Sequence, residues 1–159
     1  MATLPLGLLQ PAVAVAATCR DGDSKGSGVE RNPLSPSDVH VLVVDDEPIS
    51  RHVVSSLLKC CHYKVTTADN GAEAMDLLRA SPPGTFQLVL TDVCMPEVDG
   101  IQLLQYVKQE ENLRSVPVIM MSSIEQGSTV LDCVTYGAEE YLVKPVTRKE
   151  VVNIWQHVV

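Results

Sequence analysis

From Val39 onward, short apolar runs alternate with longer segments in which apolar residues recur every three or four positions. Short runs rich in Val, Leu and Ile are typical of buried strands, whereas the longer spacing is typical of amphipathic helices. The pattern predicts strands at residues 39–44, 65–68, 87–91, 116–121 and 141–143. Because a helical pattern follows each strand, the sequence contains five strand–helix units.

The same spacing predicts which apolar residues face inward from each helix. In chain order they are Ile49, Val53 and Leu57; Ala74, Met75, Leu77 and Leu78; Ile101, Leu104 and Val107; Val130, Leu131 and Val134; and Val151, Ile154, Trp155 and Val158. Asn70 with Glu73 has the spacing of a capping box at a helix start, and so does Thr147 with Glu150. Gly137 is placed to end the fourth helix.

Strands that are joined by helical crossovers run parallel, and right-handed connections place helices on both faces of the sheet. The predicted fold class is therefore α/β, a doubly wound five-stranded parallel sheet with five helices. Ligands of such sheets bind beyond the carboxyl ends of the strands. We therefore expect functional side chains immediately after the strands.

Residues 1–38 precede this pattern and are interpreted as a disordered leader, followed by one domain at residues 39–159. The first 19 residues are uncharged and apolar, but prolines interrupt them and no basic segment precedes them. Neither a secretory signal peptide nor a membrane anchor is favoured, and a transit peptide stays open although Arg and Ser are not enriched. Residues 20–38 lack periodicity and are rich in Gly, Ser, Pro and charges, which is typical of a linker.

The net charge of the chain is −8, and the segment from His40 onward has nine Lys and Arg against sixteen Asp and Glu. This acidity argues against a nucleic-acid-binding surface. The five cysteines are odd in number, and adjacent Cys60 and Cys61 do not resemble a disulfide framework. A reducing compartment, the cytoplasm or the nucleus, is therefore favoured. No second cluster at zinc spacing accompanies Cys60, Cys61 and His62, so we do not predict a zinc site.

Polar residues with complementary chemistry follow the predicted strands. Asp45 and Asp46 come after the first strand, Asp92 after the third, Ser122 after the fourth and Lys144 after the fifth. Parallel strands end at one rim, so these side chains are expected to converge there. Neighbouring carboxylates repel by about 4 kcal/mol per close pair at an effective dielectric near 20, so cations must lie among them. Lys144 supplies one positive charge, and hard oxygen ligands favour Mg²⁺ for the remainder.

This combination points to phosphoryl transfer. With Mg²⁺ and Lys144 neutralising a phosphoryl group and Ser122 donating to it, Asp92 is placed for in-line attack that forms an aspartyl phosphate. Each residue also has an ordinary structural interpretation, because an acidic pair after a strand is usually a solvated turn and Lys-Pro is usually a surface corner. The functional interpretation depends on the whole set at one rim.

Four segments, VLVVDDEP, LVLTDVCMPEVDG, PVIMMSS and YLVKP, stand in the order and spacing of two-component receiver domains, which the chain resembles from Val39 to Val159. The resemblance implies the flavodoxin-like strand order 2-1-3-4-5. It implies that Asp92 is the phosphoacceptor and that Asp46, Asp92 and the Cys94 carbonyl bind Mg²⁺, with Asp45 acting through water. It also implies that Ser122 and Lys144 contact the phosphoryl group.

The resemblance further implies a conformational switch. Tyr141 is similar to the family's switch aromatic, which turns inward when Ser122 moves and so changes the face made by the fourth helix, fifth strand and fifth helix. Lys144–Pro145 is similar to the family's cis peptide. Cys94 and Ile124 occupy positions that influence the attacking water in the family, and neither orients water well. We therefore expect no enzyme activity beyond self phosphoryl transfer and slow autodephosphorylation.

The implied partners follow from the same resemblance. A histidine phosphotransfer protein or a sensor histidine kinase would donate the phosphoryl group, docking near the first helix, where Ile49 and Val53 offer apolar surface. A homodimer through the face that includes the fifth strand is a further implied assembly. No direct contact with nucleic acid or with a membrane is expected from this domain.

Within the family, the runs CCHYKV, RSVPVIMMSS and NIWQHVV are most similar to green-plant and algal proteins. These are either clock-type pseudo-response regulators or DNA-binding type-B response regulators. Pseudo-regulators typically have Glu at the acceptor position, where this chain has Asp92. Both groups continue into an output region, whereas this sequence ends at Val159. We therefore expect it to describe the receiver only.

Three alternative functions agree with parts of the sequence pattern. A phosphate-independent pseudo-receiver, acting as an interaction module in a circadian-clock or transcription regulator, stays open on sequence grounds. A haloacid-dehalogenase-like phosphatase also forms an aspartyl phosphate, but it needs a second acid two residues after the nucleophile, where Cys94 stands. A nucleotide-binding Rossmann domain needs a Gly-rich turn after the first strand, where Asp45, Asp46 and Glu47 would repel a pyrophosphate.

Overall fold

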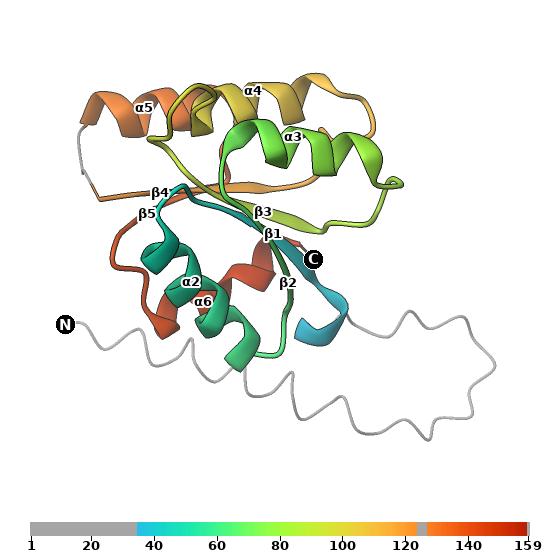
Figure 1. The fold of residues 1–159 in the computed structure, drawn as a ribbon, viewed down its shortest axis with the longest axis vertical. Coiled ribbons are helices and arrows are strands. Elements are labelled where there is room, and N and C mark those ends of the chain that lie inside the picture. Colours follow the sequence, from blue (N-terminus) through green and yellow to red (C-terminus); the bar gives the residue numbers. More distant parts are fainter. Residues whose placement is uncertain (1–34, 124–126, 159) are drawn as a thin grey trace.

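A computed structural model describes residues 35–123 and 127–158 of the chain. Its elements, in chain order, are η1 (Pro36–Asp38), β1 (His40–Val44), α2 (Pro48–Cys60), β2 (Lys64–Ala68), α3 (Gly71–Ala80), β3 (Leu88–Asp92), α4 (Gly100–Gln109), β4 (Val118–Ser122), α5 (Gly127–Thr135), β5 (Glu140–Val143), α6 (Arg148–Asn153) and η2 (Ile154–His157). The strands form one parallel sheet in the order β2-β1-β3-β4-β5. Figure 1 shows α3, α4 and α5 on one face of the sheet and α2 and α6 on the other. The predicted fold class and strand order are confirmed.

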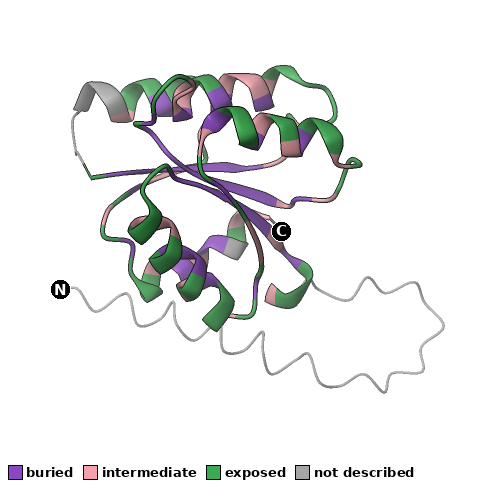
Figure 2. Cartoon of the chain, in the orientation of Figure 1, coloured by how far each residue is buried: buried purple, intermediate pink, exposed green. Residues whose placement is uncertain are grey.

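The sheet separates two apolar clusters, because successive strand residues point to opposite faces. Leu42 and Val44 of β1 pack with the helices α3, α4 and α5, whereas Val41 and Val43 pack with α2 and α6. All four side chains are fully buried, as expected for a parallel sheet covered on both faces. Figure 2 shows this buried layer running through the central strands. The central strands are therefore packed on both faces, and they support the residues that follow their carboxyl ends.

Strand register aligns the carboxyl ends of the sheet. Val44 of β1 pairs with Ala68 of β2 and with Thr91 of β3, and Ser122 of β4 pairs with Val143 of β5. The strands therefore end at nearly the same level, and the residues that follow them meet at one rim, as the sequence predicted.

Two of the predicted helix faces are partly wrong. In α2 the buried apolar residues are Val54 and Leu58, whereas the expected Ile49 is 73% exposed and Val53 is 45% exposed. The expected Leu57 is half-buried and packs against the core. The pairs Val53–Val54 and Leu57–Leu58 are both apolar, so periodicity alone fits either of two adjacent stripes. The stripe that packs on the sheet, Val54 and Leu58, is displaced by one residue from the predicted stripe of Val53 and Leu57.

The face of α5 is corrected in the same way. Cys133 is fully buried, whereas the expected Leu131 and Val134 are 65% and 57% exposed. A free cysteine behaves as a small apolar residue and fits closely against the sheet. The last predicted helix is formed by α6 and η2. Val151 of α6 and Ile154 of η2 are buried as expected, while the side chain of Trp155 lies outside the described residues.

The helix ends agree with the sequence apart from one detail. The Asn70 side chain accepts a hydrogen bond from the Glu73 amide at 2.7 Å, but the Glu73 carboxylate accepts from the Asp69 amide at 2.8 Å, one residue before the cap. At the last helix, the Thr147 amide donates to Glu150 Oε1 at 2.8 Å, as a capping box requires. Gly137 has φ +102° just beyond α5, a conformation that favours glycine.

Part of the predicted leader is described. Its last residues, Pro36–Asp38, form the turn η1, which packs beside β2. The first described element thus begins before residue 39, while the leader up to residue 34 lies outside the described residues. Among the helices that the structure describes, none has the length and apolar character needed to cross a bilayer.

Candidate functional site

Three carboxylates meet at the carboxyl edge of the sheet. Asp45 and Asp46 lie in the loop after β1, and Asp92 is the last residue of β3. Each contributes an oxygen atom, and these atoms all lie within 4.8 Å of one another. Asp45 is fully buried and Asp92 is 8% exposed, whereas Asp46 is exposed to solvent. The convergence that the sequence predicted for these residues is observed.

Lys144 links two of the carboxylates from the loop after β5. Its Nζ lies 2.8 Å from Asp45 Oδ2 and 3.1 Å from Asp92 Oδ2. The Lys144 amide donates to the Ser122 carbonyl at 2.8 Å, which fixes this loop against the end of β4. The Lys144–Pro145 peptide bond is cis, as the family resemblance implied. Lys144 is thus an ammonium group placed directly beside the candidate acceptor.

The first turn of α2 holds Asp45 through side chains that the sequence pattern did not single out. Ser50 Oγ donates to Asp45 Oδ2 at 2.6 Å, and Arg51 Nη1 donates to the Asp45 carbonyl at 2.7 Å. The Glu47 amide donates to Asp45 Oδ1 at 3.0 Å. Hydropathy cannot reveal such roles, because polar residues in a first helical turn are usually solvated. The only sequence feature that could have indicated these roles is that Ser50 and Arg51 follow the acidic pair by a few residues.

The electrostatics of the site follow from these contacts. Burial alone would raise the pKa of Asp45, but hydrogen bonds from Lys144 and Ser50 outweigh burial and lower it. Burial raises the pKa of Asp92, and the Asp45 carboxylate adds to this, while Lys144 opposes it. Burial would lower the pKa of Lys144, yet its bonds to both carboxylates raise it. Asp45 is therefore the firmly ionised partner of a charged lysine.

The remaining predicted residues lie near this centre. Ser122 is buried at the end of β4, one residue beyond the Asp92–Met121 pair. Cys94 is exposed, and its amide lies 3.4 Å from Asp92 Oδ1. Tyr141 is half-buried in β5 and packs against the cluster beneath α3, α4 and α5. Ile124 lies outside the described residues. The roles of these residues toward a phosphoryl group stay predictions.

A divalent metal ion fits the donor set. Three ionised carboxylates exceed the single positive charge of Lys144 by two, so a divalent cation would balance the cluster. Carboxylate oxygens are hard ligands that suit Mg²⁺, which usually binds one or two carboxylates and keeps several waters. Exposed Asp46 leaves the cluster open to solvent, and partly exposed Asp92 borders it. Asp45, Asp46 and Asp92 are therefore suitable residues to hold Mg²⁺.

Comparison with known proteins gives matches over most of the chain. Residues 41–156 match the response regulator receiver domain family. The chain is 42% identical over 139 residues to the two-component response regulator ARR2 of Arabidopsis thaliana, covering 87% of this chain and 20% of that protein. It is 41% identical to the two-component response regulator-like PRR37 of Oryza sativa subsp. indica, covering 83% of this chain and 19% of that protein. The chain thus spans about a fifth of the length of these relatives.

Solved structures agree with the fold. The chemotaxis protein CheY4 of Vibrio cholerae superposes with a TM-score of 0.69 at 27% identity, covering 76% of this chain and 98% of that chain. The receiver domain of the sensor histidine kinase PA1611 from Pseudomonas aeruginosa PAO1 has a TM-score of 0.68 at 27% identity, covering 76% of this chain and 96% of that chain. That structure has a magnesium ion coordinated in its active site cleft. The likeness to plant response regulators and response regulator-like proteins that the sequence suggested is confirmed.

Proposed function

The chain belongs to the response regulator receiver domain family, and from this premise we propose that it accepts a phosphoryl group on Asp92 from a phosphohistidine donor, with Mg²⁺. The observation that carries the proposal is the contact of the Lys144 ammonium with both Asp45 and Asp92 beside exposed Asp46. This contact places a cation at the carboxylate that would act as nucleophile.

The residues divide the chemistry between them. An Asp92 carboxylate oxygen attacks phosphorus, the new O–P bond forms, and the P–N bond to the donor histidine breaks. Lys144 neutralises charge on the phosphoryl oxygens, and the Ser122 hydroxyl donates a hydrogen bond to one of them. When bound by Asp46, Asp92 and the Cys94 carbonyl, with Asp45 acting through water, Mg²⁺ supplies further charge neutralisation.

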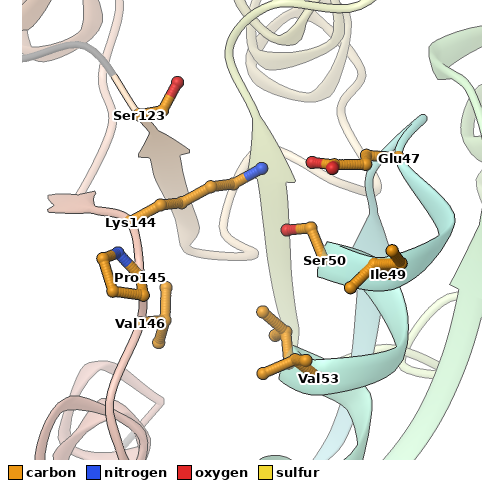
Figure 3. A pocket seen from close by; sticks show the side chains of 9 residues that line it. Glu47, Ile49, Ser50, Val53, Ser123, Lys144, Pro145 and Val146 are labelled. Carbon is orange, nitrogen blue, oxygen red and sulfur yellow. The ribbon is translucent and has the colours of Figure 1, made fainter.

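A groove beside the rim supports docking of the donor. It measures about 350 Å³ and lies between the start of α2 and the loop after β5, with Ile49, Val53, Lys144 and Val146 in its lining. Figure 3 shows these side chains around the opening. Exposed Ile49 and Val53 provide the apolar surface that a helical phosphotransfer protein or a sensor histidine kinase would cover. The proposed partner is therefore a phosphohistidine protein.

The proposed output surface is formed by α5, β5 and α6. Leu131, Val134 and Val143 are exposed apolar residues on this side, and Tyr141 lies in the same strand as Val143. Such a surface supports binding of a partner or a second copy when phosphorylation changes the packing of Tyr141. We propose the cytoplasm or nucleus as the location, because the described cysteines, Cys60, Cys61, Cys94 and Cys133, are all free thiols.

A phosphate-independent interaction module is the second candidate function. Two observations favour it: the likeness to a response regulator-like protein and the exposed apolar residues around β5. In this case the domain would bind partners without using Asp92. Phosphorylation of the isolated protein separates the two candidates.

We expect incubation with Mg²⁺ and acetyl phosphate to add one phosphoryl group, seen by intact mass spectrometry as an acid-stable, base-labile increase. Asp92→Asn should abolish the gain, because an amide is not a nucleophile toward phosphorus. Asp76→Asn, which changes an exposed acid of α3, is the matched control and should keep it. Chelation of Mg²⁺ with EDTA should also prevent the gain. A wild-type protein that never gains the mass would favour the interaction module.

A second prediction concerns the lifetime of the phosphoryl group. Cys94 is exposed two residues beyond Asp92, and a thiol is a weak hydrogen-bonding group that orients water poorly. We expect slow self-dephosphorylation, with a half-life well above seconds in Mg²⁺. Cys94→Asn should shorten it by about threefold to tenfold, less than the effect of a full general base. Loss of the added mass within seconds in the wild type would contradict the expectation, as would an unchanged half-life in Cys94→Asn.

A further inference from the structure

One oxygen of Asp45 accepts hydrogen bonds from two separate parts of the chain. Ser50 Oγ lies 2.6 Å from Asp45 Oδ2, and Lys144 Nζ lies 2.8 Å from the same atom. Ser50 belongs to the first turn of α2, whereas Lys144 follows β5. Figure 3 shows the Lys144 side chain extended toward the turn that carries Ser50. The Asp45 carboxylate is thus held between the hydroxyl and the ammonium group.

We propose that Ser50 is a positioning residue for phosphoryl transfer, which holds Asp45 so that Lys144 stays in reach of Asp92. The inference rests on the proposed function of Asp92 as the acceptor. Ser50 touches neither Asp92 nor the group to be transferred, and it acts through Asp45 and Lys144. By holding the Asp45 carboxylate, the Ser50 hydroxyl fixes the position of the Lys144 ammonium group.

The distances show why the hydroxyl matters. Lys144 Nζ is already closer to Asp45, at 2.8 Å, than to Asp92, at 3.1 Å. Asp45 is fully buried, so solvent does not readily replace a lost donor on its Oδ2 atom. Without the Ser50 hydroxyl, this oxygen attracts the ammonium more strongly. Lys144 then moves toward Asp45 and away from Asp92, where the phosphoryl group would be transferred.

The main chain around Asp45 leaves the carboxylate little freedom to compensate. The Asp45 amide donates to the Ala68 carbonyl at 3.2 Å, and Arg51 Nη1 donates to the Asp45 carbonyl at 2.7 Å. The Glu47 amide holds Oδ1 at 3.0 Å. With both ends of the residue and one carboxylate oxygen fixed, a change at Oδ2 is transmitted to Lys144.

The Ser50 hydroxyl does not have a capping role in the helix. Glu47 is the N-cap of α2 and Pro48 occupies the first helical position, so Ser50 stands two residues inside the helix. Its hydroxyl bonds to the Asp45 side chain, away from the helix backbone. A role at the site therefore accounts for this hydroxyl better than helix stability does.

The first test compares phosphorylation rates at saturating Mg²⁺ and acetyl phosphate. Ser50→Ala should lower the rate about fivefold, a fraction of the worth of a hydrogen bond to a charged group. Ser50→Thr keeps the hydroxyl, so its phosphorylation rate should stay within about twofold of the wild-type rate. Valine has the shape of threonine without the hydroxyl, so Ser50→Val should be as slow as Ser50→Ala. Ser56→Ala, at an exposed serine of the same helix, should leave the rate unchanged.

The second test measures urea unfolding in EDTA, which requires neither metal nor phosphodonor. Ser50→Ala should lower the urea midpoint in the wild-type background but not in an Asp45→Ala background, because the partner of the hydroxyl is then absent. An equal shift in both backgrounds overturns the inference. So does a wild-type rate in Ser50→Ala, or a Ser50→Val variant that matches Ser50→Thr. If the wild type gains no phosphoryl group, this inference and the proposed function both fall.

Discussion

Lys144→Met should lower the free energy of unfolding by about 3–5 kcal/mol, the usual cost of removing one partner of a buried ion pair. Lys144 is the ammonium that contacts Asp45, whose side chain is fully buried, and Asp92, which is nearly so. Methionine fills a similar volume but leaves the two carboxylates without their cation. The same change should slow phosphorylation on the order of 10²-fold, as for other preorganised donors of positive charge.

Urea denaturation at pH 7 in EDTA measures the stability effect. Lys149→Met, at an exposed lysine in α6, is the matched control and should change stability by less than about 0.5 kcal/mol. Combining Lys144→Met with Asp45→Asn should recover part of the loss, because the buried charge is then removed as well. A Lys144→Met protein as stable as the Lys149→Met control would show that the pair contributes little.

The direction of the pH dependence is fixed by the same contacts. The pKa of Asp45 is lowered, burial being outweighed by the bonds from Lys144 and Ser50. Its ionised form therefore contributes stability that is present above the unfolded pKa, near 3.9, and is lost as pH falls through the folded value. In Lys144→Met this contribution disappears, because the ionised carboxylate then lacks its cation. The difference in free energy of unfolding between Lys144→Met and the wild type should consequently become smaller as the pH falls into the acid range.

The convergence of Asp45, Asp92 and Lys144 could be predicted from the sequence, because helical crossovers make the five strands parallel. Residues that follow parallel strands meet at one edge of the sheet, whereas the order of the strands came from the family resemblance. That inference needs only the order of the elements. It does not depend on the position of any individual side chain.

The faces of α2 and α5 could not be predicted, because adjacent apolar pairs make the phase of a short helix ambiguous. Val53 and Val54 are the same residue type, so only packing against the sheet decides which one is buried. This ambiguity affects which apolar residues lie at the surface, because the misassigned residues Ile49, Leu131 and Val134 are exposed in the fold. Ser50 was missed for a different reason, because its role depends on a distance between elements that only the folded chain defines.

Gly100→Ala should destabilise the domain by about 3 kcal/mol or more, at the upper end of what overpacking usually costs. A Cβ atom at Gly100 would overlap the Asp92 carbonyl oxygen and would lie 2.9 Å from Val93 Cα. Both are backbone atoms, one in the last residue of the buried strand β3 and one in the residue that follows it, so neither can move without displacing Asp92, the proposed acceptor. Helix propensity predicts the opposite sign, because alanine is normally preferred over glycine in a helix by about 1 kcal/mol.

Gly84→Ala is the control for the general cost of replacing a glycine. Gly84 has φ +88° and nothing lies within 4 Å of an added Cβ, so only backbone strain of about 1–2 kcal/mol is expected. Thermal or urea unfolding of both variants measures the difference. Because Gly100 begins α4 directly against the Asp92 backbone, Gly100→Ala should also slow phosphorylation under conditions in which the variant is still folded. A Gly100→Ala protein at least as stable as the wild type would mean that α4 and the acceptor strand pack less tightly than the structure shows.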